Sequence, residues 1–320
     1  MRQEGPESKE LVSLVGGHPE LVRRMATSDG DAEYGSDDRP GWLSGTAASE
    51  GGGNLDEATS LAGQQSTSDS LDEGEFWLEP LQQWAGIASH VFALAAAAVV
   101  FTWATELGGV SWKQGEAKIV FNWHPVCMII AFLFMTISAL SFRMKWRAKN
   151  RFVTKMLHII EWSIAGLCMA VGLVAVVKSH NDPVSGYIAN LYSLHSWIGI
   201  AVLILYALQF FVGVFSFGFD SKKLGPAKKA KIMLLHKFMG PFIYISMAAT
   251  ILLGIQEKEG FIGCHYEVTK PDLFPPAHLS EIPRACKISH SLGIIVLVTT
   301  LSTTFALHDF NSAGSSRRSD

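Results

Sequence analysis

Charged residues are scarce in this sequence of 320 residues. They make up 17% of the chain, whereas 48% of the residues are hydrophobic, and the mean hydropathy is positive. In an ordinary soluble domain about a quarter of the residues are charged. The composition therefore argues against a soluble globular protein.

Several nucleotide-binding and catalytic motifs are also missing. No GxGxxG stands between a strand and a helix, and only about a dozen residues follow the last apolar segment, which excludes a flavin or nicotinamide domain. There is no Walker motif, no catalytic triad and no nucleic-acid-binding module, so we expect no nucleic-acid partner. Any electron donor must then come from solution.

Long apolar runs are absent from residues 1–80, which are rich in Ser, Gly, Asp and Glu. This segment has 5 Lys/Arg against 17 Asp/Glu, a net charge of −12, which leaves +9 on the rest of the chain. Such a composition buries too little apolar surface to offset the entropy of ordering, so we expect a disordered acidic tail. No apolar segment follows Met1, which argues against a cleaved signal peptide.

Six long apolar segments follow, from Trp84 onward. We expect each to form a membrane-spanning helix, because about 20 apolar residues in helical form cross the hydrocarbon core of a bilayer. The predicted fold class is all-α, an integral membrane bundle of six helices that occupies residues 84–307. The predicted helices cover residues 84–107, 118–142, 153–178, 190–217, 232–256 and 286–307.

The distribution of basic residues predicts the orientation. The connectors after the second and fourth spans, with their flanking turns, hold 12 Lys/Arg, whereas the three connectors on the other face hold 7. The positive-inside rule places the more basic face in the cytosol, together with residues 1–80 and 308–320. Topology and contact with lipid headgroups alone are the other explanation of these clusters. No sorting signal separates the plasma membrane from an endomembrane such as a vacuole, lysosome or vesicle.

Four histidines stand near the starts of four consecutive spans: His124, His158, His195 and His236. An ionisable side chain inside a membrane is costly unless it is paired or ligated. His124 and His195 begin helices that enter from the non-cytosolic side, and His158 and His236 begin helices that enter from the cytosol. The sequence therefore predicts two histidine pairs at two depths.

Two imidazoles on facing helices can supply both axial ligands of a haem iron. At 1.5 Å per residue, the two irons would lie about 18 Å apart along the membrane normal. A lone intramembrane histidine is more often a hydrogen-bonded core residue, but four in a paired pattern favour ligation. Zinc would require a closed set of four ligands with Cys or carboxylates nearby, and neither pair offers one.

The residues around these histidines form recognisable stretches, namely FNWHPVCM, TKMLH, NLYSLHSWIG and LLHKFMG, and GIQEK follows the fifth span. Together they resemble the cytochrome b561 family over about Trp84 to Leu307. The resemblance implies two haem b groups per chain, held by the second to fifth helices, and usually a homodimer. It also implies transmembrane electron transfer from cytosolic ascorbate to monodehydroascorbate or a ferric chelate on the other side.

The resemblance also implies the haem ligands and the substrate-binding residues. The ligands are His124 with His195 for the non-cytosolic haem, and His158 with His236 for the cytosolic haem. Cytosolic ascorbate would contact four basic residues: Arg143, Arg151, Lys155 and Lys229. The acceptor would contact residues of the stretch KSHNDPVSGYIANLYSLHSW: His180, Asn181 and Tyr192. An interfacial polar rim and aromatic belt is the alternative role for His180 and Tyr192.

The four cysteines fall into two groups. Cys127 and Cys168 lie within predicted spans and are expected to be small core residues. Cys264 and Cys286 lie in the same non-cytosolic loop, where a disulfide is expected if the compartment is oxidising. Two unpaired thiols are the alternative, since no spacing rule forces these cysteines together.

Two functions of other classes stay open. A transporter or channel could use the intramembrane histidines to carry protons, and it would show no haem absorbance band. A membrane adaptor could use the acidic tail as its partner site, and it would keep binding that partner after loss of haem. The leading hypothesis is a transmembrane ascorbate-dependent oxidoreductase.

Overall fold

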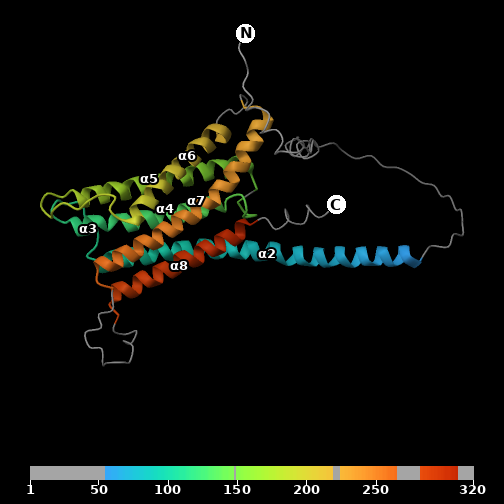
Figure 1. Cartoon of the computed structure of the whole chain (residues 1–320), viewed down its shortest axis with the longest axis horizontal. Helices are drawn as coiled ribbons and strands as arrows, with labels where there is room; N and C mark the ends of the chain where they lie inside the picture. Colours follow the sequence, from blue (N-terminus) through green and yellow to red (C-terminus); the bar gives the residue numbers. More distant parts are fainter. Residues whose placement is uncertain (1–54, 148, 219–223, 265–281, 309–320) are drawn as a thin grey trace, which may run out of the picture.

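The computed structural model of the chain is a bundle of long helices (Figure 1). It describes residues 55–147, 149–218, 224–264 and 282–308, with side chains from residue 78 onward. The elements in these ranges are α2 (Leu55–Glu106), α3 (Ala117–Phe121), α4 (Trp123–Ala139), α5 (Arg151–His180), α6 (Leu194–Gly213), the π-helix η2 (Val214–Gly218), α7 (Pro226–Phe261) and α8 (Arg284–Leu307).

Among the described residues, six helices are long and apolar enough to cross a membrane: α2 from Leu78 onward, α3 with α4, α5, α6 with η2, α7 and α8. The prediction of an all-α bundle with six spans is confirmed. One boundary is wrong, because α2 begins at Leu55 whereas the predicted tail reached residue 80. Asp56 and Glu57 favour a helix start there, since acidic residues complement the helix dipole, and no proline follows before Pro80. The other predicted tail residues, 1–54 and 309–320, lie outside the described residues.

The second span is divided into α3 and α4 at Asn122. This buried side chain donates through Nδ2 to the backbone oxygens of Leu107 (3.2 Å) and Gly109 (2.8 Å) in the α2–α3 connector. The break therefore fixes the start of α4, where His124 lies, against the end of α2.

The helix ends meet in two groups (Figure 1). At one end, which we call the basic end, lie the end of α4 and the start of α5, the end of η2 and the start of α7, the start of the α2 span and the end of α8. There Gln83 Nε2 donates to the backbone oxygen of Arg143 (2.9 Å), and the Arg143 guanidinium donates to that of Leu307 (2.7 Å). At the opposite end lie the α2–α3 and α5–α6 connectors, the end of α7 and the start of α8. There the Gly115 N–H donates to the Asp182 carboxylate (2.7 Å).

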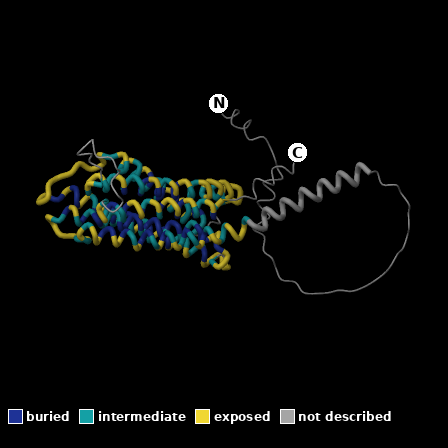
Figure 2. Tube along the Cα trace, turned by 90° about the horizontal axis from the view of Figure 1, so that it is seen from below, coloured by how far each residue is buried: buried dark blue, intermediate teal, exposed yellow. Residues whose placement is uncertain are grey.

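The bundle buries a continuous apolar core and leaves apolar side chains on its outside. Trp103, Phe132 and Tyr244 are among the largest buried side chains. Leu167 on α5 and Leu234 on α7 are two-thirds exposed, and exposed positions recur along the outside of the helices (Figure 2). An apolar exterior of this kind suits hydrocarbon, since the helices satisfy their own backbone hydrogen bonds.

Candidate functional site

At the opposite end, His124 at the start of α4 faces His195 at the start of α6. Their ring centroids are 6.0 Å apart. Nδ1 of His124 lies 3.3 Å from the backbone oxygen of Gly172, and Nδ1 of His195 lies 2.9 Å from that of Thr250. A ring that donates from Nδ1 keeps Nε2 free as a ligand, which is the usual support for a metal-bound histidine.

At the basic end, His158 of α5 faces His236 of α7. Their ring centroids are 6.4 Å apart. Nδ1 of His158 lies 2.8 Å from Ser138 Oγ and 3.0 Å from the Ser138 backbone oxygen. Nδ1 of His236 is buried without a hydrogen-bond partner among the described residues. The structure thus brings together both predicted histidine pairs, each at a different end of the bundle.

The spacing of each pair fits a haem iron between the two rings. With about 2 Å from iron to nitrogen and about 1.2 Å from nitrogen to ring centre, trans imidazoles place their centroids about 6.3 Å apart. The observed separations of 6.0 and 6.4 Å bracket this value. Among the described residues, no group of three or more His, Cys, Asp or Glu side chains could hold a metal ion. Two-histidine ligation is therefore the metal chemistry that this geometry offers.

Glycines on neighbouring helices provide the space that two of the histidine rings occupy. A Cβ on Gly254 of α7 would lie 2.7 Å from Cε1 of His195, and a Cβ on Gly213 of α6 would lie 3.0 Å from Cε1 of His236. A contact of 2.7 Å is shorter than a Cβ atom tolerates, so a larger residue at Gly254 would displace the His195 ring. The contact of 3.0 Å at Gly213 is tighter than most, so a larger residue there would push the His236 ring by a few tenths of an ångström. The sequence pattern of the histidines carried no sign of these supports.

A stacked aromatic pair lies in the core near the basic-end pair. The rings of Trp162 and Tyr206 have centroids 4.5 Å apart and an interplanar angle of 24°, and the Tyr206 hydroxyl donates to the Trp162 backbone oxygen. Both residues are buried, and the Trp162 ring lies 6.2 Å from that of His158. The stacked rings therefore pack α5 against α6 one turn beyond His158.

The basic residues predicted to bind ascorbate all lie at the basic end. Lys155 is half-buried one turn before His158 on α5, and Arg151 is exposed at the start of that helix. Lys229 is half-buried in the first turn of α7, the helix that carries His236. Three positive side chains therefore come from the two helices that hold the basic-end histidines.

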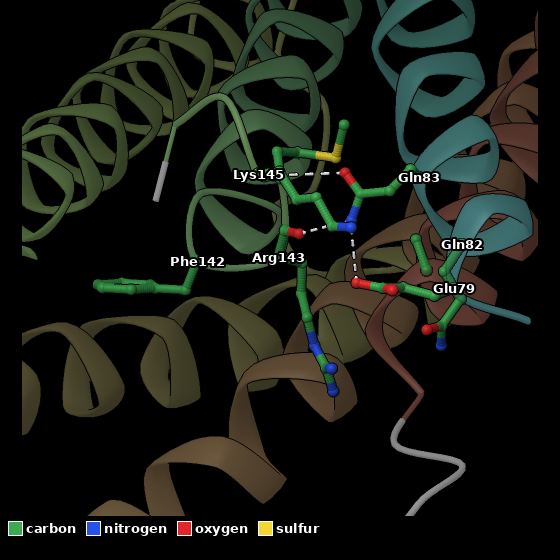
Figure 3. A pocket seen from close by; sticks show the side chains of 8 residues that line it. Glu79, Gln82, Gln83, Phe142, Arg143 and Lys145 are labelled. Carbon is green, nitrogen blue, oxygen red and sulfur yellow. Dashed lines mark hydrogen bonds and ion pairs between the residues drawn. The ribbon is translucent and has the colours of Figure 1, made fainter. Parts of the chain in front are cut away.

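Arg143 is placed differently from the other three. It lines a pocket of about 200 Å³ together with Glu79, Gln82, Gln83 and Lys145, between α2, the α4–α5 connector and the end of α8 (Figure 3). Its guanidinium donates to the end of α8 at Leu307. Arg151, Lys155 and Lys229 are not among the residues that line this pocket. The neighbouring Phe142 ring, 5.6 Å from that of His158, connects this region to the histidine site.

At the opposite end, His180 and Tyr192 lie together and Asn181 points elsewhere. The His180 ring is 6.3 Å from the Tyr192 ring, and its Nδ1 lies 3.1 Å from Asn190 Oδ1. The Asn181 amide donates back to the Val177 backbone oxygen, and the residue lines a separate pocket of about 210 Å³ with Lys113 and Lys178.

Two ionisable side chains at the opposite end have shifted pKa values. Partial burial raises the pKa of Tyr192 above its ordinary value, and the Glu257 carboxylate adds to this effect through a hydrogen bond and through its negative charge. The Val184 N–H, followed by the Gly115 N–H and the Ser185 hydroxyl, holds the pKa of Asp182 below its usual range despite burial. Asp182 therefore ties the α2–α3 connector to the segment after α5 as an ionised carboxylate.

The structure also reveals contacts that the sequence reasoning missed. Phe121 stacks on His180 with centroids 6.3 Å apart, lies 5.7 Å from the His124 ring, and carries the Lys258 ammonium 4.6 Å above its own ring. At the basic end, Arg147 forms an ion pair with Glu161, and both side chains are 10% exposed. Glu161 could have been found, because an acidic residue inside an apolar span is itself a signal.

The structure joins Cys264 to Cys286 by a disulfide, with Cα atoms 5.7 Å apart. This confirms the predicted pairing and ties the end of α7 to the first turn of α8. Cys127 and Cys168 are free, the first buried and the second half-buried, as expected of small core residues.

Comparison with known proteins identifies the family. The family profile of eukaryotic cytochrome b561 matches residues 123–262. Three similar proteins are an ascorbate-specific transmembrane electron transporter of Zea mays, a transmembrane ascorbate ferrireductase of Arabidopsis thaliana and a transmembrane ascorbate-dependent reductase of Mus musculus. The Zea mays protein is 38% identical to this chain over 55% of the chain and 72% of its own length. The Arabidopsis thaliana protein is 35% identical over 54% of the chain and 71% of its own length. The Mus musculus protein is 35% identical over 58% of the chain and 71% of its own length. The chain therefore belongs to the cytochrome b561 family of haem-binding membrane proteins.

Proposed function

We propose that this protein carries electrons across a membrane from cytosolic ascorbate, through two haem b groups, to monodehydroascorbate or a ferric chelate on the other side. The observation that carries the proposal is the presence of two histidine pairs at opposite ends of one bundle, each with the ring separation of a bis-histidine haem. The names of the relatives support ascorbate as the donor and a reductase activity.

The side chains have distinct tasks in this mechanism. His124 and His195 would hold one haem, and His158 and His236 the other, with Nδ1 contacts fixing three of the four rings. Each haem, when bound, supplies an iron that takes up and releases one electron.

Positive charge at the basic end would attract the donor. Ascorbate is an anion at neutral pH, and three cations precede the histidines on the same two helices: Arg151 and Lys155 come seven and three residues before His158, and Lys229 comes seven residues before His236. Charge-assisted contacts of this kind are stronger than neutral hydrogen bonds. At the opposite end, the acceptor would approach through the His180 and Tyr192 rings, which lie near His124 by way of Phe121.

The excess of basic residues gives the orientation. The connectors at the basic end would face the cytosol, together with the acidic segment 1–80 and residues 308–320, on either side of the membrane domain at 84–307. The protein would function as a homodimer in contact with lipid.

Sided proteoliposomes test the proposal. The purified protein is reconstituted, ascorbate is enclosed, ferric citrate or monodehydroascorbate is offered outside, and proteolysis of the acidic segment reports the orientation. We expect reduced-minus-oxidised haem bands and acceptor reduction when the basic end faces the enclosed ascorbate. A purified protein without haem bands, as in a proton carrier, would refute the proposal, and so would transfer that does not depend on orientation.

A further inference from the structure

The ion pair of Arg147 and Glu161 is buried next to the basic-end histidine site and has no role in the mechanism above. Arg147 belongs to the α4–α5 connector, and Glu161 lies three residues after His158 on α5. Their side chains are in direct contact, and each is 10% exposed. Removing two charges from water costs several kcal/mol per ion, so a buried pair is weak evidence for a purely stabilising role.

Two nearby serines contact the pair and the His158 imidazole: Ser138 in the last turn of α4 and Ser141 just after that helix. The second carboxylate oxygen of Glu161 accepts from Ser141 Oγ at 3.0 Å. Ser138, one turn earlier, contacts Nδ1 of His158 through its Oγ and donates from the same Oγ to the His158 backbone oxygen at 3.2 Å. The carboxylate and the imidazole are therefore held against the same short segment.

The connector is fastened so that the arginine stays in place. Thr154 Oγ1 on α5 donates to the Arg147 backbone oxygen at 2.9 Å, and the guanidinium carbon of Arg147 lies 5.5 Å from the centre of the Trp146 ring. Nε of Arg147 is buried without a partner among the described residues. The two charges thus have fixed positions, and Glu161 stands one helical turn after His158 on α5.

We propose that Arg147 and Glu161 form a charge-compensated pair that sets the reduction potential of the haem held by His158 and His236. The inference rests on the proposed function, because it requires a haem at this site. Reduction adds one negative charge to the haem, so a nearby cation favours the reduced state and a nearby anion opposes it. Inside a low-dielectric bundle these effects are large, and they are among the means by which proteins tune haem potentials.

Because the two charges are opposite, removing each one alone should shift the haem potential in opposite directions. A merely structural role of the pair would not produce shifts of opposite sign. Glu161→Gln leaves Arg147 uncompensated and should raise the midpoint potential of this haem. Arg147→Met leaves Glu161 uncompensated and should lower it. The double variant should return close to the wild-type potential, because both charges are then absent.

The experiment is potentiometric titration of the purified full-length protein, followed by absorbance and by the separate low-spin electron paramagnetic resonance signals of the two haems. Lys149→Met, which removes an exposed charge from the same connector, should leave both potentials unchanged. If either buried variant loses haem, Ser141→Ala is used instead, and removing this donor from Glu161 should lower the same potential.

Three outcomes would overturn the proposal. They are a shift in the same direction for both single variants, a double variant displaced as far as the singles, and a larger shift at the haem of His124 and His195. A wild-type protein without haem would instead refute the proposed function. If the protein holds two haems and these substitutions leave both midpoint potentials unchanged, the charge-tuning role is refuted and the proposed function still stands.

Discussion

Gly254 on α7 lies directly behind the ring of His195, where an added Cβ would be 2.7 Å from Cε1. We therefore predict that Gly254→Ala displaces the imidazole and lowers the haem content at the opposite end. The haem-to-protein ratio from the pyridine haemochrome should fall from about two towards one. Gly260→Ala on the same helix, where a Cβ meets nothing within 4 Å, is the matched control and should keep full haem content. Equal ratios in the two variants would contradict this account of the site.

Loss of one basic-end histidine should remove one haem and spare the other. His236→Ala would take away a proposed haem ligand, whereas the rings of His124 and His195 keep their separate backbone contacts. We expect about one haem per chain, with the remaining spectrum matching that of the opposite-end site, and the reverse result for His124→Ala. A wild-type ratio near one, or haem content that is independent of all four histidines, would rule out the two-site arrangement.

Lys155, one helical turn before His158, is the best placed of the predicted donor contacts. Lys155→Ala would remove the proposed charge-assisted contact to ascorbate, which we expect to weaken donor use by roughly 1.5 to 3 kcal/mol. Stopped-flow reduction with ascorbate should slow, while reduction by dithionite should keep its rate. Lys149→Ala, at an exposed position of the connector, is the control. Equal slowing with both reductants would point to a damaged fold.

Asp182 should stabilise the opposite-end connectors in a pH-dependent way. Because hydrogen bonds hold its pKa below the usual value near 4, the ionised carboxylate stabilises the folded state above that value, and this contribution disappears as the pH falls through the lowered pKa. Asp182→Asn should therefore lower the unfolding temperature at neutral pH, and the difference from wild type should shrink in acid.

Thermal unfolding in detergent at several pH values measures this difference. Glu116→Gln removes a carboxylate from the neighbouring connector and serves as the control. A deficit in Asp182→Asn that stays constant into strong acid would show that size or polarity, and not the charge, explains the effect.

The disulfide between Cys264 and Cys286 should be present in protein isolated without reductant. Closing a loop over a separation of 22 residues restricts the unfolded chain by about 3 kcal/mol in the chain-entropy model. Non-reducing peptide mapping should recover the linked peptide, while Cys127 and Cys168 should be recovered unlinked. Free alkylation of Cys264 and Cys286 would refute the bond and weaken the proposed non-cytosolic placement of this loop.

The sequence by itself determined the six spans and the two histidine pairs. Hydrocarbon imposes a minimum length on each span, and four histidines near the starts of consecutive antiparallel helices necessarily alternate between two levels. The extent of α2 was missed because a polar composition was read as disorder, although helix formation also depends on end charges and on the absence of proline. The other predicted helix ends differ from the observed ends by a few residues, because helix ends fray and their caps are hard to locate from sequence.

Only the tertiary structure decided which contacts surround the histidines. Arg143 and Lys155 look equivalent in sequence, yet Arg143 donates to the end of α8 whereas Lys155 stays on the helix of His158. The need for glycine at position 254 on α7 comes from the His195 ring on α6. The ion-pair partner of Glu161 is Arg147, which lies in the α4–α5 connector. Local periodicity fixes which face of a helix is apolar. The rotation and approach of neighbouring helices, which depend on packing along their whole length, select the individual partners.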